Sequence, residues 1–164
     1  MKNILLSGDG GQGVQLIAKI LCSVAFDAEQ HVTSIPNYGL EQRGGVSLNF
    51  IQIDEAPIVY PKFKTADLLL ILSPQARERT IQFVGDNTIV IDIADYAEVI
   101  KEAQVPRRSQ NIFFLGVLTT VLEKENIGIT KDAVLILLEN MLSKKAGWEE
   151  NKKSFEAGLH MNLS

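Results

Sequence analysis

Residues 3–14 read Asn3-Ile-Leu-Leu-Ser-Gly-Asp-Gly-Gly-Gln-Gly-Val14, an apolar run followed by a glycine-rich loop. The unbroken apolar run is typical of a parallel strand that is buried on both faces. Beyond the loop, apolar side chains recur at steps of three and four and predict a helix with one apolar stripe: Val14, Ile17, Leu21, Val24 and Ala28. A strand, a glycine loop and a helix in this order indicate the opening unit of a Rossmann-like fold.

The glycines of this loop follow the spacing Gly-x-Gly-x-x-Gly. We expect Gly8 to permit the tight turn, Gly10 to let a ligand approach the main chain, and Gly13 to let the helix pack closely against the strand. The unpaired amides that open the helix favour a phosphate or another anion. The alternative is a tight strand-to-helix turn that binds nothing.

Two features of nucleotide-binding domains are missing. A dinucleotide-binding fold usually has an acidic residue at the end of its second strand, where it binds the ribose hydroxyls. Here the second strand is expected over His31–Ile35, ended by Pro36, and no acid follows it. The loop also lacks the lysine followed by serine or threonine that a nucleoside triphosphate loop requires. Both absences disfavour NAD and nucleoside triphosphates.

The middle of the chain predicts a less regular strand. Val46, Leu48 and Phe50 share one face, but Ile51 and Ile53 reverse the phase. Such a reversal predicts a bulge or a twist into an edge position.

Further strands and helices complete an α/β pattern. Pro57–Pro61 is expected to return antiparallel beside the irregular strand, because prolines are tolerated at edges. The apolar runs Leu68–Leu72 and Thr88–Ile91 predict central strands, and Ser73-Pro74 supplies a helix start. Later helices are expected over 112–126, 131–144 and 148–158. We predict a single Rossmann-like three-layer domain over residues 1–164, with a mostly parallel sheet and an edge hairpin.

Composition excludes several classes of protein. The chain has 164 residues, 22% of them charged and 46% hydrophobic, as in one folded domain. A net charge of −4 argues against nucleic-acid binding, and one cysteine excludes a cysteine-only iron–sulfur cluster or a four-cysteine zinc site. With two distant histidines, no metal site is expected. No apolar run is long enough to span a membrane, and we expect a cytoplasmic protein with no membrane contact.

A second glycine cluster follows the second strand. It combines Tyr38, Glu41, Arg43, Gly44 and Gly45 within eight residues. The planar fork of the arginine suits a phosphate or a carboxylate. Taken alone, the cluster is better explained by a surface ion pair of Glu41 with Arg43 and a turn at the glycine pair.

Together the two clusters resemble the gamma subunit, or gamma domain, of the 2-oxoacid:acceptor (ferredoxin) oxidoreductases. This family includes the pyruvate, 2-oxoglutarate, 2-oxoisovalerate and indolepyruvate enzymes. The resemblance extends over nearly the whole chain and rests on these segments: Gly8–Val14, Tyr38–Gly45, Pro57–Pro61 and Ala66–Leu69, with later traces at Asn111, Leu115-Gly116 and 151–158.

The resemblance implies a subunit of a complex that oxidatively decarboxylates a 2-oxoacid to an acyl-CoA and reduces ferredoxin. Thiamine diphosphate, magnesium and iron–sulfur clusters are then expected only in the partner subunits, alpha, beta and in some cases delta. The gamma part is expected to share in the coenzyme A site and in subunit contacts, and to be inert alone. An isolated chain is also expected to be able to form a homodimer in place of its partners.

On this basis we predict no catalytic residue in the chain, but a set of residues for the coenzyme A site: Gly8, Gly10, Gly11, Gln12, Gly13, Tyr38, Glu41, Arg43, Gly44 and Gly45. Backbone amides and the Gln12 side chain would face the coenzyme, and Arg43 would lie at the same edge of the sheet. A subunit interface is an equal alternative for the second cluster. A stand-alone nucleotide- or flavin-binding reductase and a purely structural assembly subunit remain the other readings of the chain.

Overall fold

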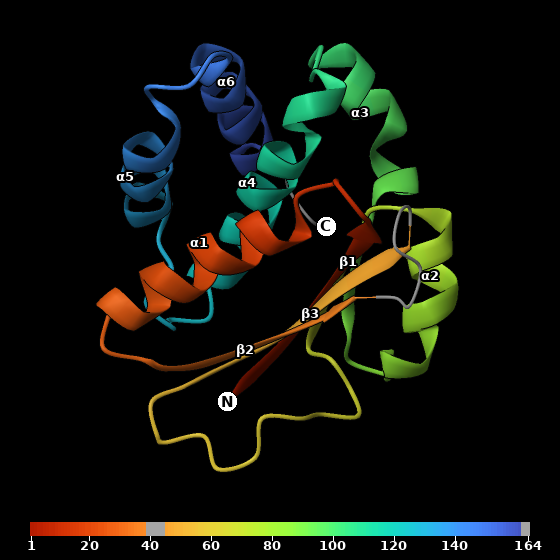
Figure 1. Ribbon diagram of the computed structural model, residues 1–164, viewed down its shortest axis with the longest axis vertical. Coiled ribbons are helices and arrows are strands. Elements are labelled where there is room, and N and C mark those ends of the chain that lie inside the picture. The colour runs from red at the N-terminus through yellow and green to blue at the C-terminus, as the bar shows by residue number, and fades with distance from the viewer. Residues whose placement is uncertain (39–44, 162–164) are drawn as a thin grey trace.

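The computed structural model describes residues 1–38 and 45–161 and contains one five-stranded sheet of order β2-β3-β1-β4-β5. The strands are β1 (Lys2–Asp9), β2 (His31–Tyr38), β3 (Val46–Asp54), β4 (Leu68–Ile71) and β5 (Ile89–Asp92). The helices are α1 (Val14–Asp27), α2 (Pro74–Thr80), α3 (Ala97–Glu102), α4 (Gln110–Glu123), α5 (Lys131–Leu142) and α6 (Trp148–Leu159) (Figure 1). No helix among these residues is long and apolar enough to cross a membrane.

The sheet is mostly parallel, as the sequence predicts. Strand β1 pairs in parallel with β4, and β4 with β5, whereas β3 is antiparallel to both β1 and β2. Strands β2 and β3 therefore form the antiparallel hairpin at one edge. The expected edge hairpin is present, but its second strand is β2 and not Pro57–Pro61, which forms no strand.

The prediction for β3 is wrong in two respects. The strand lies inside the sheet, and its pairing with β1 runs without a bulge from Asp9↔Val46 to Lys2↔Ile53. Both of its faces are buried, so apolar side chains are needed on each. The polar residues Ser47 and Asn49 suggest a solvent-facing side, but both are buried and hydrogen-bonded to Gln15 of α1.

Two other strand predictions also need correction. Strand β5 is at the sheet edge rather than in its centre, and Ile89 and Val90 are accordingly 38% and 40% exposed. Strand β2 continues through Pro36 to Tyr38 instead of ending at the proline. An edge strand tolerates proline because one side of it has no ladder to complete.

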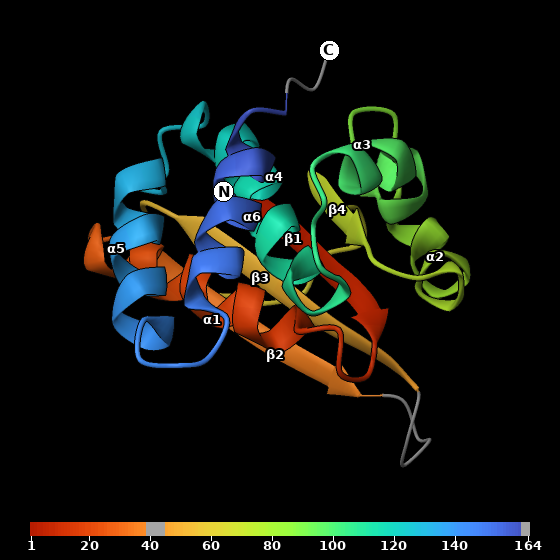
Figure 2. The same cartoon turned by 90° about the horizontal axis from the view of Figure 1, so that it is seen from above.

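The sheet is covered on both faces, which makes the three-layer domain that we expect. On one face the larger core unites β1, β3 and β4 with α1, α4, α5 and α6 (Figure 2). On the other face Leu5, Leu48 and Leu69 pack with Ala76 of α2, and Phe50, Phe63 and Phe83 adjoin them. The layers leave free the sheet edge at which the parallel strands end.

Helices α4 and α6 cross in unusually close contact at two glycines. A Cβ added at Gly116 would lie 2.3 Å from the Phe155 carbonyl oxygen, and one at Gly158 would lie 2.1 Å from that of Phe113. This crossing fixes the position of α6, whose first turn reaches the site described below.

Candidate functional site

The parallel strands end together at one edge of the sheet. Ser7 of β1 is aligned with Ile71 of β4, and Ile71 is aligned with Asp92 of β5. The segments that follow these strands, among them the glycine loop, therefore meet at one place. Open α/β folds bind ligands at this edge.

The glycine loop has the backbone conformation that its glycines permit. Gly11 and Gly13 have φ angles of +92° and +79°, in the left-handed region, and Gly13 is the N-cap of α1. A Cβ at Gly13 would lie 2.2 Å from Asn111 Nδ2 on α4. The close approach expected between Gly13 and the strand is therefore wrong: the neighbour of Gly13 is a second helix. The approach to the strand ends occurs at Gly8, where a Cβ would lie 3.0 Å from the Leu72 Cβ.

The Gln12 side chain stabilises the glycine loop through two hydrogen bonds to backbone groups. Its Oε1 accepts a hydrogen bond of 2.5 Å from the Asp9 amide, and its Nε2 donates one of 2.9 Å to the Leu72 carbonyl. The side chain thereby joins the end of β1 to the end of β4. Its predicted contact with a ligand stays a prediction, whereas its structural role is visible.

Asp9 is held on the other side of the loop. Its Oδ1 accepts a hydrogen bond of 2.7 Å from the buried Ser73 hydroxyl, and the same hydroxyl oxygen caps α2 by accepting from the Ala76 amide. This confirms the helix start expected at Ser73-Pro74. The carboxylate is thus tied to the end of β4.

A pocket of about 500 Å³ opens at this edge. Its residues come from the loop, from the ends of two strands and from the chain that leads into α4: Gly10, Gly11, Gln12, Leu72, Ile93, Arg107, Arg108, Gln110 and Asn111. The volume lies within the usual range for small-molecule sites. Gly10, Gly11 and Gln12 of the predicted set line the pocket directly. Gly8 and Gly13 do not, but they lie close to Leu72 and Asn111, which do.

The two arginines are the residues that the sequence analysis misses. They lie about a hundred residues from the glycine loop, and the only signal is a consecutive pair after Pro106 and just before a helix. Arg108 Nε donates a hydrogen bond of 2.9 Å to Glu150 Oε2, and the two residues form an ion pair. Arg107 has no ion-pair partner within residues 1–38 and 45–161.

The positive ends of two helices also converge on the pocket. Helices α1 and α4 each have 14 residues, and neither has a side-chain cap or an acidic residue in its first turn. Each therefore presents first-turn amides without a side-chain partner and a partial positive charge that no acidic side chain compensates. Together with Arg107, these groups favour an anionic ligand.

The second glycine cluster flanks the first. The Gly10 amide donates a hydrogen bond of 2.9 Å to the Gly45 carbonyl, and Tyr38 is aligned with Ser47 at the same end of the hairpin. Glu41, Arg43 and Gly44 lie outside the described residues. The structure thus brings Gly45 to the glycine loop, as predicted.

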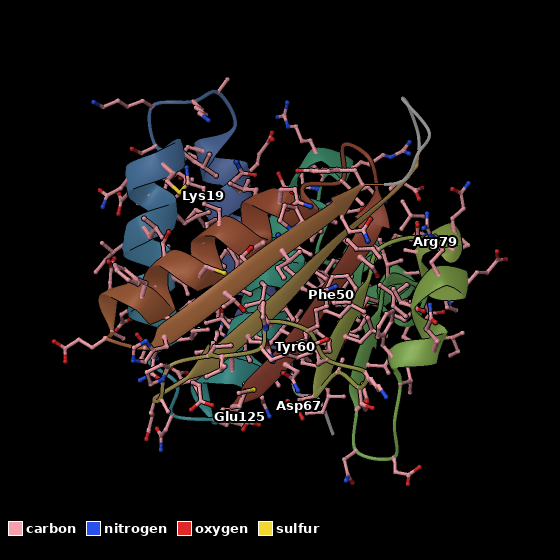
Figure 3. The ribbon with its side chains drawn as sticks, turned by 60° about the horizontal axis from the view of Figure 1, so that its bottom comes forward. Lys19, Phe50, Tyr60, Asp67, Arg79 and Glu125 are labelled. Atoms are coloured by element: carbon pink, nitrogen blue, oxygen red, sulfur yellow. The ribbon has the colours of Figure 1, made fainter. Side chains whose placement is uncertain are left out.

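Tyr38 lies on a different surface from the glycine-loop pocket. It lines a second hollow of about 570 Å³ with Phe50, Phe63 and Phe83, on the face of the sheet that α2 covers. Phe50 is labelled in Figure 3, and its ring centroid lies 5.4 Å from that of Phe63 and 5.3 Å from that of Phe83. Tyr38 is therefore separated from the residues that line the glycine-loop pocket.

Two other titratable groups have structural explanations. Burial raises the pKa of the Cys22 thiol to about 11, although a hydrogen bond with Ser34 opposes the shift. Burial also opposes ionisation of Asp92, but hydrogen bonds from Arg77 and the Ala94 amide hold its pKa below the ordinary value. Within the described residues no three His, Cys, Asp or Glu side chains gather as a metal site would require.

These features define an open α/β domain with a pocket at the carboxyl edge of its sheet, lined by a glycine loop and two arginines. The family model of the pyruvate ferredoxin/flavodoxin oxidoreductases matches residues 3–161. The chain belongs to that family, and the resemblance drawn from its two glycine clusters is confirmed.

Two relatives of known name are a common gamma subunit and a subunit of a 2-oxoglutarate synthase. The chain is 29% identical over 139 residues to the common gamma subunit of the pyruvate/ketoisovalerate oxidoreductases of Pyrococcus abyssi, covering 82% of this chain and 75% of the relative. It is 30% identical over 148 residues to the 2-oxoglutarate synthase subunit KorC of Methanocaldococcus jannaschii, covering 88% and 79%.

Solved structures share the fold. The gamma subunit of a keto/oxoacid ferredoxin oxidoreductase from Geobacter sulfurreducens aligns with a TM-score of 0.72 at 22% identity, over 96% of each chain. The 2-oxoglutarate:ferredoxin oxidoreductase of Magnetococcus marinus, solved with 2-oxoglutarate, coenzyme A and succinyl-CoA, aligns with a TM-score of 0.76 at 18% identity. That alignment covers 96% of this chain and 30% of the other.

Proposed function

We propose that this chain, as the gamma subunit of a multi-subunit 2-oxoacid:ferredoxin oxidoreductase, supplies one wall of the coenzyme A site through the glycine-loop pocket. The observation that supports this role is the convergence of the loop, two helix N-termini and Arg107 on one pocket. Coenzyme A bears phosphate groups, and this pocket offers the amides and positive charge that phosphate needs.

The relatives support the same ligand. The relatives named above are subunits of pyruvate/ketoisovalerate oxidoreductases and of a 2-oxoglutarate synthase, and a solved oxidoreductase that contains this fold over 30% of its chain has coenzyme A bound. The ligand class that the pocket favours on physical grounds therefore agrees with the ligand of a structural neighbour.

The contribution of the chain is binding and orientation. Gly10 and Gly11 expose main chain to the pocket, while Gly8, Gln12 and Gly13 hold the loop in shape. Thiamine diphosphate with magnesium, and iron–sulfur clusters, supply the carbanion chemistry and the electron transfer from the partner subunits. The residues of this pocket would hold the phosphates of the coenzyme, while the partner subunits would supply the chemistry at its thiol, and the chain alone is expected to be inactive.

A matched pair of substitutions at Gly11 tests the coenzyme site. Nothing lies within 4 Å of a Cβ at this position, and its φ of +92° strains aspartate and asparagine alike. Gly11→Asp and Gly11→Asn therefore differ mainly in one negative charge. In the assembled complex we expect Gly11→Asp to raise the KM for coenzyme A about tenfold or more above Gly11→Asn, with kcat little changed. Equal KM values for the two variants would remove the glycine loop from the site.

The second cluster has a test of its own. We assign Arg43, with Glu41 and Gly44 in the same segment, either to the coenzyme or to a subunit interface. Arg43→Ala that assembles normally but binds coenzyme A more weakly supports the first role, and failed assembly supports the second. Unchanged assembly and affinity would exclude both.

The competing functions predict different results. A stand-alone reductase binds an adenine nucleotide or a flavin without partners, which a titration of the isolated chain would detect. A purely structural subunit leaves the affinity of the complex for coenzyme A unchanged in Gly11→Asp. The lack of an acid after β2 argues against the dinucleotide-binding alternative.

A further inference from the structure

We propose that Arg107 binds a phosphate group of the ligand in the glycine-loop pocket, and that Glu150 neutralises the neighbouring Arg108. This inference rests on the proposed coenzyme A function and identifies the side chain that recognises the phosphate. Among the residues of the predicted set that the structure describes, none that lines the pocket carries a positive charge.

The backbone beneath Arg107 is held rigidly while its side chain is exposed. Arg107–Ser109 form a single 3-10 turn that begins after Pro106, and the Ser109 amide donates to the Pro106 carbonyl over 2.8 Å. Ser109 is fully buried, and its hydroxyl donates a hydrogen bond of 2.8 Å to Asn151 Oδ1 of α6. A guanidinium on such an anchored turn has a defined reach into the pocket.

Arg108 differs from its neighbour in its electrostatic environment. Its guanidinium donates to Glu150 Oε2 from both Nε and Nη2, and Glu150 belongs to the first turn of α6. The close crossing of α4 and α6 at Gly116 and Gly158 holds these two residues together. The two charges cancel, so among the described residues that line the pocket Arg107 is the cation without an ion-pair partner.

The ligand class follows from this arrangement. A guanidinium presents a planar fork of donors that matches two oxygens of one phosphate, and the amides at two helix N-termini add donors from other directions. The neutral amides and the thiol of coenzyme A can accept hydrogen bonds from these donors, but they leave the positive charge of the guanidinium uncompensated, whereas a phosphate neutralises it. The recognised group is therefore a phosphate, and both the diphosphate and the 3′-phosphate of coenzyme A have this chemistry.

The test uses the assembled complex and the variant Arg107→Gln, with Arg79→Gln as control. Arg79 is an exposed arginine on α2 (Figure 3) and is not among the described residues that line the pocket. A charge-assisted contact of this kind corresponds to about a 10- to 100-fold rise in the KM for coenzyme A, with kcat at saturation unchanged. The control is expected to stay within about twofold of the unmodified complex.

Two substrates identify which phosphate is bound. If Arg107→Gln weakens coenzyme A but not dephospho-coenzyme A, the arginine binds the 3′-phosphate. If it weakens both by the same factor, the arginine binds the diphosphate. An unchanged KM for both substrates overturns the inference.

A second variant is expected to act in the opposite direction. Glu150→Gln leaves Arg108 charged without its partner, so the pocket gains positive charge. We expect the KM for coenzyme A to fall about two- to fivefold, as the loss of an exposed ion pair allows. A merely structural role for this corner of the fold predicts that both variants weaken binding, and that result would overturn the inference.

Failure of this inference can be told apart from failure of the proposed function. If Gly11→Asp raises the KM for coenzyme A and Arg107→Gln does not, the coenzyme site stands and Arg107 has no part in it. If neither variant changes the KM for coenzyme A, both the proposed coenzyme site and the role of Arg107 are wrong. Size-exclusion chromatography of each complex reports assembly. Failed assembly of both Arg107→Gln and Arg107→Lys would place Arg107 in a subunit interface and overturn the inference.

Discussion

The Gly10 amide donates a hydrogen bond of 2.9 Å to the carbonyl oxygen of Gly45. These residues belong to different glycine clusters, and between them lie α1 and the whole of β2. The bond joins the loop after β1 to the start of β3, so the clusters meet at one edge of the sheet. Both clusters are required for the family resemblance, and the structure gives a physical reason for their pairing.

Removing the Gln12 side chain is expected to loosen the loop. Gln12→Ala leaves the Asp9 amide and the Leu72 carbonyl without their partners, at a cost of about 1–3 kcal/mol in the free energy of unfolding. Urea denaturation of the purified chain measures this change. Gln82→Ala is the matched control, because Gln82 is exposed and its side chain, within the part of the chain that the structure describes, bonds only the nearby Arg79 carbonyl. A control as destabilised as Gln12→Ala would contradict the bracing role.

Much of the glycine-loop unit could be predicted from the sequence because its determinants are local. The apolar run, the glycines and the stripe of α1 lie within residues 3–28, and each has its own spacing. Strand β3 could not be predicted in the same way. Ser47 and Asn49 look like surface residues until Gln15, more than thirty positions earlier, supplies their hydrogen bonds.

The pocket residues, too, could be predicted from the sequence only where their determinants are local. The glycine spacing predicts Gly10, Gly11 and Gln12 as site residues. Arg107 and Arg108, in contrast, reach the pocket only because α4 packs beside the N-terminus of α1. Sequence spacing has no information on which later helix meets an earlier loop. Asn111, one of the late family traces, lies at that contact against Gly13.

The crossing of α4 and α6 is expected to depend on a glycine. Gly116→Ala would place a Cβ 2.3 Å from the Phe155 carbonyl oxygen, a backbone atom that cannot move without shifting α6. The higher helix propensity of alanine returns only about 1 kcal/mol, and we expect a net loss of about 1–3 kcal/mol in the free energy of unfolding. The urea midpoint of the chain measures it.

A second alanine serves as the control for this crossing. Gly85→Ala would meet the Thr65 side chain, whose methyl carbon lies 2.6 Å from the added Cβ and can rotate away. We expect Gly85→Ala to lower the free energy of unfolding by less than Gly116→Ala. Equal losses in the two variants would show that the α4–α6 backbone contact has no special cost.

Cys22 is expected to be almost unreactive in the folded chain. Because burial raises the pKa of its thiol to about 11, very little thiolate is present at pH 8. An unfolded cysteine with a pKa of about 8.5 has a few hundred times more thiolate at that pH. The rate of reaction with Ellman's reagent should therefore rise at least about a hundredfold in denaturing urea.

Raising the pH from 8 to 10 should increase the rate of the native chain about a hundredfold, because the thiolate fraction grows tenfold per pH unit below the pKa. The unfolded chain passes its own pKa in this interval, and its rate should rise only about fourfold. A native rate that levels off near pH 9 would show that the thiol is solvated and that its burial against the core does not control its ionisation.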